Sequence, residues 1–411
     1  AGGGVVSLTS NFRSLAQIGE WVNQAFAELL PGETDQFQAC FSRLDTVRVS
    51  GPGDLCGIRK LSIPRVERHA QEKIAALDAE RIARWIRYAL DERITLTRTR
   101  EETAAGIDGR ARPQDFLILF RYKSHMTVYA QALEEYGIPL KMSGGDGFST
   151  SAELTQLIRL LRALMDPENP IKLLAVLRGP LFGFNDNQLL RLQQAGGRFN
   201  LEWPIPETLH PDDAEAFYLT FKTLERLRGY LIDLPASAAL QRIIVETGLL
   251  PIAGAGELGK SRAGYLLQAQ ELLAAAERSG RVSPSQLVEY LEILREQGVE
   301  EEITVTPEMD DAVRLMNLHK AKGLEAPVVF LAHPGKTVNR DPSLHINRQG
   351  GMPVGYYMLE KKGPFYTSQV LGCPLEWEEQ LKREIEYTTA EEIRLLYVAA
   401  TRARNLLVIS C

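Results

Sequence analysis

One continuous apolar run, Phe116–Phe120, constrains the fold of this chain more than any other feature. Its five residues are all large and hydrophobic, so a strand formed here would have no face suited to water. Strands of that kind occur in parallel sheets that carry helices on both faces. Apolar runs at Val328–Leu331 and Leu406–Ile409, and the strand-like segment Ala312–Met316, predict further strands of the same sheet.

Stretches with apolar residues at helical spacing lie between these runs. We expect helices over residues 15–29, 74–89, 129–136, 154–165 and 393–400. A strand is also expected near residues 5–8 and another just after Pro139, whereas residues 31–65 should be irregular because Pro and Gly interrupt them. Strands that alternate with helices in this way are typical of an α/β fold.

The hydrophobic pattern changes over residues 165–302, where it is helical apart from loops near 179–187 and 204–212. This stretch is also acidic, with 13 Lys and Arg against 20 Asp and Glu. We therefore predict an α/β domain formed by residues 1–164 and 303–411, with an all-helical domain over 165–302 inserted into it. A length of 411 residues agrees with two or three domains at about 150 residues each.

Composition excludes several classes of protein. The formal net charge is −6, so the chain lacks the overall positive charge of many nucleic-acid-binding domains, although a local basic groove is still compatible with it. The four Cys and six His residues are scattered without metal-ligand spacing, which predicts free thiols in a reducing cytoplasm and no metal site. No apolar run approaches the roughly 18 residues of a membrane span, so no membrane partner is expected. The start, Ala1-Gly2-Gly3-Gly4, lacks Met and a signal region, as expected of a fragment.

One segment, Gly254–Ser261, fits the G-x-x-x-x-G-K-S pattern of a phosphate-binding loop. Such a loop works only between a buried strand and a helix, where backbone amides at the helix N-terminus surround the phosphates. The residues before it, 243–252, are interrupted by Gly248 and Pro251 and lie in the helical stretch. The pattern thus favours an ordinary loop at the start of a helix over a true phosphate loop with Lys260 as ligand.

Three further segments are informative because of their order and spacing. The first, Thr9–Ser14, lies where a strand passes into a helix. The second, Asn317–Glu325, directly precedes a predicted strand, and the third, Glu391–Ala403, is an amphipathic helix that leads into the last strand. Alone, each suits a capped helix start, a basic turn or a charged surface helix.

Together these segments resemble motifs IV, V and VI of the superfamily 1 helicases of the UvrD, Rep and PcrA type. The stretch Asp115–Leu190, with Gly137-Ile138-Pro139 and Leu177–Gly183, is most similar to the RecB and AddA branch, also known as exonuclease V-like. The resemblance covers nearly the whole chain, but only as the C-terminal half of such a helicase. It implies that the α/β domain is the second RecA-like domain of a P-loop NTPase-type motor.

The resemblance also implies a set of residues around ATP. Arg13 and Arg402 match the two arginines that reach the γ-phosphate, although a surface ion pair is the alternative for each. Phe12 stands where the family has a Tyr that stacks on adenine, and Glu325 matches the glutamate that hydrogen-bonds the ribose, with Gly323 beside it in the same motif. ATP and Mg²⁺ would be bound mainly by the N-terminal RecA-like domain, which carries the phosphate loop and the Asp-Glu motif of the family.

DNA contacts are implied for the start of the second segment. His319 and Asn317 match the part of motif V that lies against single-stranded DNA, with Asn317 in place of the usual Thr. Lys320 and Lys322 are either further phosphate contacts or solvated charges at a helix start. Contacts that do not depend on base sequence suit a translocating motor.

The sequence thus predicts the C-terminal part of an ATP-dependent 3′-to-5′ DNA helicase of bacterial type, active in repair or recombination. Its expected partners are single-stranded and duplex DNA, the N-terminal RecA-like domain, and a nuclease domain or partner subunit. This segment alone should lack activity. One alternative is a protein-interaction or regulatory module centred on the helical stretch, and another is a self-sufficient NTPase that uses Gly254–Ser261.

Overall fold

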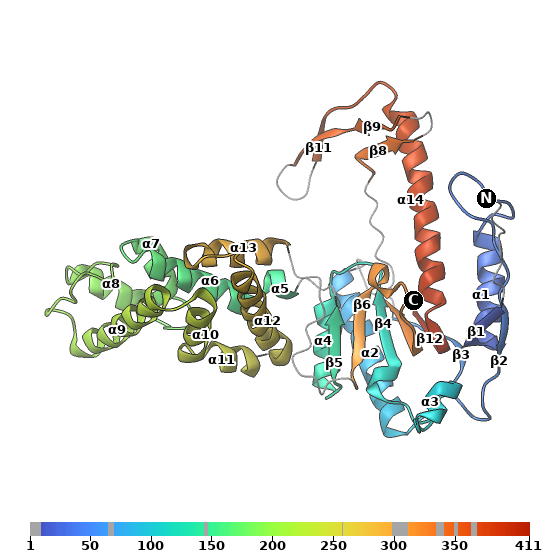
Figure 1. The fold of residues 1–411 in the computed structure, drawn as a ribbon, viewed down its shortest axis with the longest axis horizontal. Coiled ribbons are helices and arrows are strands. Elements are labelled where there is room, and N and C mark those ends of the chain that lie inside the picture. The colour runs from blue at the N-terminus through green and yellow to red at the C-terminus, as the bar shows by residue number, and fades with distance from the viewer. Residues whose placement is uncertain are drawn as a thin grey trace. The chain divides into compact units, whose positions relative to one another are not determined.

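The structure is a computed structural model that divides into two compact units (Figure 1). The first unit comprises residues 1–140 and 311–411, and the second comprises residues 141–310. Described residues are 10–64, 70–143, 147–256, 258–297, 311–333, 341–348, 352–362 and 368–411.

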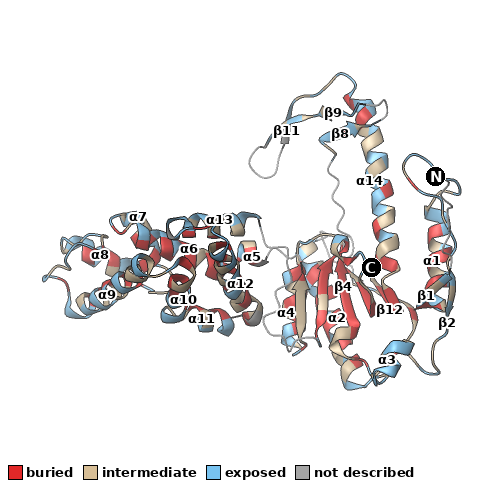
Figure 2. Ribbon diagram, in the orientation of Figure 1, coloured by how far each residue is buried: buried red, intermediate tan, exposed pale blue. Residues whose placement is uncertain are grey.

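A six-stranded sheet forms the centre of the first unit. The strands, in their spatial order, are β3 (Gly57–Leu61), β12 (Ala403–Ser410), β7 (Ala326–Ala332), β4 (Phe116–Phe120), β6 (Val313–Asn317) and β5 (Leu140–Ser143). The pairings of β12 with β3 and β7, and of β4 with β6 and β7, are all parallel. All five residues of β4 are buried, as the apolar run predicted (Figure 2).

Helices cover both faces of this sheet. The helices of the first unit are α1 (Ala16–Leu29), α2 (Gln71–Asp91), α3 (Arg100–Ala104), α4 (Met126–Glu135) and α14 (Trp377–Ala400). On one face, α1 and α14 pack with Leu117, Leu119 and neighbouring strand residues in a single buried cluster. On the other face, Trp85 of α2 lies edge-on to Phe116 at 6.2 Å and to Phe330 at 5.5 Å between ring centres. The central strands β12, β7, β4 and β6 therefore bury side chains on both of their faces.

Three short two-stranded sheets complete the first unit. β1 (Ser10–Leu15) pairs in parallel with β2 (Asp45–Arg48). Two antiparallel pairs precede α14, namely β8 (Leu344–Asn347) with β9 (Val354–Tyr357), and β10 (Leu359–Lys362) with β11 (Ser368–Gly372). The β8–β9 pair lies beside the N-terminal half of α14 (Figure 1).

Apart from residues 141–143, which belong to strand β5, the regular elements described in the second unit are helices. Its α-helices are α5 (Gly147–Thr150), α6 (Ala152–Met165), α7 (Pro170–Leu177), α8 (Asp186–Gln194), α9 (Pro211–Asp233), α10 (Ala236–Glu246), α11 (Leu249–Ala255), α12 (Gly259–Arg278) and α13 (Leu287–Gln297). One buried cluster, from Phe148 to Leu291, joins them. Among the described residues of the whole chain, no single helix is both long enough and apolar enough to cross a membrane. Helices α10 and α11 meet these two criteria only when they are taken together, and that pair is bent by 57°.

Several predicted elements are found with small shifts. The runs at 116–120, 312–316, 328–331 and 406–409 form β4, β6, β7 and β12. Residues 31–65 were expected to be irregular, but they contain β2 and β3. β3 is an edge strand with a mixed sequence, Gly-Ile-Arg-Lys-Leu, so it lacked an apolar signal. The strand expected at residues 5–8 lies outside the described residues.

The unit boundary also differs from the predicted one at residue 164. Helix α6 was assigned to the α/β part, yet it belongs to the second unit, whose boundary lies at residue 140. The reason is its packing, because Leu154, Leu157 and Leu161 are buried in the helical cluster. A helix of this kind has the same periodicity whichever core it joins, so the sequence pattern alone did not assign it.

A buried ion pair anchors the start of β4 and yields a stability prediction. Arg98 donates to both carboxylate oxygens of Asp115, at 2.6 and 2.9 Å, and both side chains are 5% exposed. Replacing Arg98 with Met leaves the buried Asp115 carboxylate without its cationic partner, so we expect the free energy of unfolding to fall by about 3–5 kcal/mol. Urea denaturation measures this. Arg87→Met is the matched control, since Arg87 pairs with Asp91 on the surface, where a change of about 0.5 kcal/mol is expected.

Candidate functional site

The parallel pairing of β7 with β12 brings two distant motifs together. Ala326 at the start of β7 lies opposite Ala403 at the start of β12, and the Ala326 N–H donates to the Arg402 carbonyl at 3.1 Å. Glu325 and Arg402, the residues just before these two strands, therefore meet at the amino-terminal edge of the sheet. The end of the second motif and the end of the third form one site.

Arg402 is held by three hydrogen bonds at this edge. Its guanidinium donates to the carbonyls of Val398 at 2.9 Å and Leu324 at 3.1 Å, and to the Thr401 hydroxyl at 3.2 Å. Burial lowers the pKa of Arg402, and the nearby positive charge of Arg13 lowers it further. Arg402 is half-buried, because α14 ends beside it and the Val398 carbonyl accepts from its side chain.

Arg13 reaches the same site from β1. The Asn11 side chain accepts from the backbone N–H groups of Arg13 and Ser14, and the Ser14 hydroxyl donates to the Ala403 carbonyl at 3.0 Å. This fixes β1 against the start of β12 and directs Arg13 to Glu325, with which it forms an ion pair. Arg13 is thus in an ion pair, but its partner is another predicted nucleotide residue, and the two side chains are 42% and 37% exposed.

Arg404 is a member of the site that the sequence pattern did not reveal. It is 9% exposed and contacts two carboxylates, Glu102 at 2.5 Å and Glu325 at 3.6 Å. Glu102 is also the third residue of a capping box on α3, in which it and Thr99 exchange backbone and side-chain hydrogen bonds. The spacing Thr99-x-x-Glu102 is a readable helix-start signal. Nothing in it, however, indicated that the same glutamate would bind an arginine about three hundred residues later.

Arg48 completes the group on the side of β2. It donates to the Arg13 carbonyl at 2.5 Å, and burial together with the charge of Arg404 lowers its pKa. Burial raises the pKa of Glu102, but hydrogen bonds from the Thr99 N–H and from Arg404 outweigh it, so the net shift is downward. Glu102 is accordingly held in its charged form.

The charges at this edge do not balance. We define the arginine cluster as Arg13, Arg48, Arg98, Arg402 and Arg404, which share the carboxylates Glu102, Asp115 and Glu325. Like charges brought together in a partly desolvated site cost free energy, and an anionic ligand offsets that cost. Within the described ranges, no group of three or more His, Cys, Asp or Glu side chains could hold a metal ion. The chemistry that the cluster offers is therefore guanidinium binding of an anion such as a phosphate.

Two other predicted nucleotide residues lie nearby in the chain. Phe12 precedes Arg13 in β1 and is 71% exposed, so its ring is accessible to a stacking partner. Gly323 has φ +90°, a backbone conformation that side chains rarely adopt, and it forms the turn that leads to Glu325. Gly323 thus allows the turn before Glu325, and Phe12 presents an exposed aromatic ring.

The predicted DNA residues lie in the segment after β6, which begins at the opposite, carboxyl-terminal edge of the sheet and returns to Leu324 and Glu325 at the amino-terminal edge. Asn317 is buried, and its side chain accepts from the His319 N–H at 3.0 Å and donates to the Arg121 carbonyl at 3.0 Å. This geometry makes Asn317 the cap of a short 3-10 turn, Leu318–Ala321, instead of a free donor. His319 and Lys322 are exposed, and Lys320 is partly exposed.

The structure explains the Gly254–Ser261 pattern without a phosphate. The element before the loop is helix α11, whereas a phosphate loop follows a strand. A side chain at Gly259 would collide with the Gly254 carbonyl, so the second glycine is needed for the close approach of α12 to α11. This geometry disfavours the self-sufficient NTPase, because a helix stands where a phosphate loop requires a buried strand.

Comparison with known proteins agrees with the motifs. Residues 260–411 match the model of the UvrD-like helicase C-terminal domain. The chain is 27% identical to the A subunit of the ATP-dependent helicase/nuclease of Geobacillus kaustophilus, covering 99% of this chain and 33% of that protein. The protein of the same name from Heliobacterium modesticaldum is 31% identical and covers 72% of this chain and 22% of its own length.

A third relative of that name, from Bacillus mycoides, is 26% identical and covers the whole chain and 34% of its own length. The chain thus spans about a third of the length of the curated relatives that it matches over its full extent. The resemblance to the C-terminal half of UvrD-type helicases, nearest to the RecB and AddA branch, is confirmed.

The hydrogen bonds of Arg402 predict that it also contributes to stability. Arg402→Lys keeps the charge but loses at least two of three hydrogen bonds, so unfolding should become easier by about 1–2 kcal/mol. Arg13→Lys, in a more exposed ion pair, should change stability by about 0.5 kcal/mol or less. Chemical denaturation of both variants measures the difference. Equal effects would contradict the assignment of Arg402 as the anchored member of the cluster.

Proposed function

We propose that this chain is the second RecA-like domain, with an inserted helical domain, of an ATP-dependent DNA helicase that acts in repair or recombination. The observation that carries the proposal is the convergence of Arg13, Arg402 and Glu325 at one sheet edge from three motifs far apart in sequence. The relatives' name, which describes one chain of an ATP-dependent helicase/nuclease, and the UvrD-like family match support the same motor class.

In this proposal, the arginine cluster acts on ATP held mainly, with Mg²⁺, by a first RecA-like domain. Negative charge develops on the phosphoryl oxygens during hydrolysis, and preorganised guanidinium groups stabilise it. Arg402 is preorganised by its three hydrogen bonds, so little reorganisation is needed when nucleotide arrives. The exposed ring of Phe12 is offered to the adenine.

Arg13 differs from Arg402 because its charge is paired with Glu325 before ATP arrives. A triphosphate competes for Arg13, and Glu325 has a second partner, Arg404, already at 3.6 Å. We infer that Glu325 moves toward Arg404 and toward the ribose as Arg13 turns to the γ-phosphate. This exchange leaves no carboxylate unpaired, so the site can switch without a large loss of stability.

The DNA contacts in the proposal come from the segment that follows β6. His319, Lys320 and Lys322 are at least partly exposed on the turn after β6 and suit backbone phosphates. The buried Asn317 acts by shaping that turn. Translocation in the 3′-to-5′ direction, a nuclease domain or partner subunit, and a cytoplasmic site of action follow from the motor class proposed.

Mutation of Arg402 tests the proposal. In the full-length protein, Arg402→Lys should reduce the kcat of DNA-stimulated ATP hydrolysis by about a hundredfold or more, with a much smaller change in ATP affinity, because the contact strengthens in the transition state. An ammonium cannot reproduce the planar, forked donor set of arginine. Steady-state kinetics and nucleotide titration measure the two quantities, and Arg87→Lys on the surface of α2 is the matched control. A normal kcat in a folded Arg402→Lys protein would refute the role in hydrolysis.

The Gly254–Ser261 segment provides a second test. Lys260→Ala should leave the ATPase activity of the full-length protein nearly unchanged, whereas loss of a true phosphate-loop lysine reduces it by orders of magnitude. The 411-residue chain alone should show no DNA-stimulated ATP hydrolysis, because half of the proposed nucleotide site is supplied by another domain. Robust turnover by the chain that disappears in Lys260→Ala would instead establish the self-sufficient NTPase.

A further inference from the structure

A pocket with a mixed polar and apolar lining lies in the first unit, and its lining includes no member of the arginine cluster. It is a cavity of about 390 Å³ bounded by the loop after α1, by β8 and by the N-terminal half of α14. Its lining residues combine rings, cations and amides: Gln36, Phe37, Leu344, His345, Ile346, Asn347, Arg348, Arg383, Glu384 and Tyr387. The volume is within the range of small-molecule sites, roughly 300–1,000 Å³.

The loop that forms one wall is fixed to α14. Arg394 donates to the Phe37 carbonyl at 2.6 Å, and the buried Gln38 side chain donates to the Ala390 carbonyl at 3.1 Å. Asp35 accepts from the backbone N–H groups of Phe37 and Gln38, which closes a tight turn. The wall is therefore held by specific bonds from both sides.

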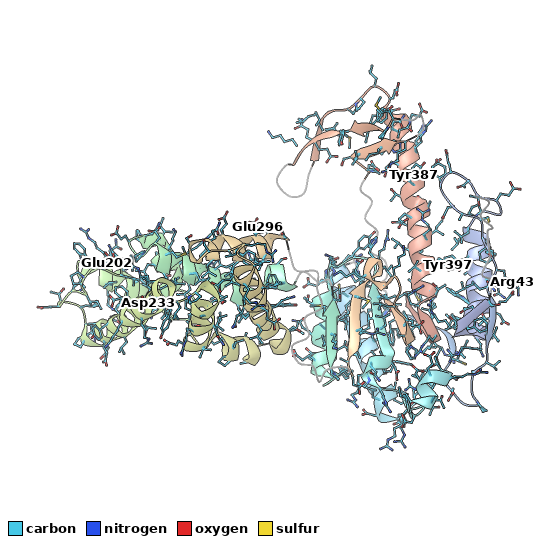
Figure 3. All side chains as sticks on the ribbon, viewed as in Figure 1. Arg43, Glu202, Asp233, Glu296, Tyr387 and Tyr397 are labelled. Carbon is cyan, nitrogen blue, oxygen red and sulfur yellow. The ribbon has the colours of Figure 1, made fainter. Side chains whose placement is uncertain are left out.

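Aromatic rings form the floor of the pocket. Phe37 lies edge-on to Tyr387 with ring centres 4.8 Å apart, and the His345 ring is nearly parallel to Tyr387 at 6.2 Å. His345 is 3% exposed, and its Nδ1 lies 2.7 Å from a carboxylate oxygen of Glu384. Figure 3 labels Tyr387 on α14, next to the β8–β9 pair and well separated from Tyr397 near the other end of the helix. These rings offer flat surfaces to a planar ligand.

Two arginine side chains line the pocket, and they differ in exposure. Arg348 follows β8 and is exposed, and Arg383 of α14 is partly exposed and forms a surface ion pair with Glu379 one turn earlier. Glu384, the acidic residue in the lining, is already bonded to His345. Arg383 and Glu384 thus already have partners, and the exposed Arg348 is the lining cation most accessible to an anionic group, with the rings of Phe37 and Tyr387 in the same lining.

We propose that this pocket binds one nucleotide unit of single-stranded DNA, with the base against Tyr387 and Phe37 and the phosphate against Arg348 and Arg383. Aromatic stacking surfaces next to cations that follow the backbone are the standard means of holding single strands without reading sequence. The inference rests on the proposed function for its ligand class, and it adds a grip on DNA that lies outside the three motifs. A free nucleotide shares this chemistry, and the test separates the two sources.

The test is binding of a fluorescein-labelled oligothymidylate of eight nucleotides to the 411-residue chain at low salt without ATP, followed by anisotropy. Tyr387→Ala should weaken binding about tenfold or more, whereas Tyr387→Phe, which keeps the ring, should bind nearly as the unchanged chain does. Arg348→Ala and Arg383→Ala should each weaken binding several-fold. Lys382→Ala is the matched control, because Lys382 is exposed on α14 beside Arg383 but is not in the lining.

Thermal melting of each variant separates lost binding from lost folding, and the exposed Arg348 keeps the test valid if Tyr387→Ala unfolds. Equal loss for Lys382→Ala and Arg383→Ala would overturn the proposal, because it would show diffuse electrostatic attraction. Competition by thymidine monophosphate at the oligonucleotide's own affinity would assign the pocket to free nucleotides and overturn the strand assignment. Because ATP is absent, failure here leaves the kcat effect of Arg402→Lys standing, and failure of the arginine role leaves this binding test standing.

Discussion

Arg404, buried at the start of β12, is the group on which the candidate site depends. A buried guanidinium is stable only when its charge is matched, and Arg404 is matched by Glu102 of α3 and Glu325 before β7. Those two contacts connect a short capped helix, a central strand and the last strand of the sheet. The rigid position of Arg404 in turn gives Glu325 a second partner, so the Arg13 ion pair can open without isolating a carboxylate. A fixed arginine thus allows a neighbouring arginine to move.

In the proposed function, the two edges of the sheet have different roles. At the amino-terminal edge, β7 and β12 begin next to the arginine cluster, whose excess of positive charge suits a polyphosphate. At the carboxyl-terminal edge, the turn that begins after β6 presents the exposed His319, which suits a nucleic-acid backbone. β6 and β7 are consecutive strands joined by this turn and by Gly323. Residues 318–325 thus connect the turn after β6 covalently with Glu325, which is the path that the proposed function uses to couple hydrolysis to movement.

Much of the sheet could be predicted from the sequence, because strands buried on both faces leave continuous apolar runs such as Phe116–Phe120. The edge strand β3 could not, since its Arg59 and Lys60 are exposed and it relies on pairing with β12 for its place. The boundary near residue 140 was missed because helical periodicity does not reveal which core a helix joins. Arg13, Arg402 and Glu325 were predicted as site residues through the resemblance. Arg404 was missed because it is the second residue of a strand, and its role depends on ion pairs with residues that are distant in sequence.

The central claim is that the arginine cluster faces the γ-phosphate of ATP bound by a partner RecA-like domain. A structure of the full-length protein with single-stranded DNA and ADP plus a metal-fluoride mimic of the transferring phosphate tests it most directly. The account predicts the guanidinium groups of Arg13 and Arg402 within hydrogen-bonding distance of the mimic, about 2.7–3.2 Å, with Glu325 shifted from Arg13 to Arg404. A structure in which Arg13 is still paired with Glu325 and both arginines lie out of reach of an occupied nucleotide site would contradict it.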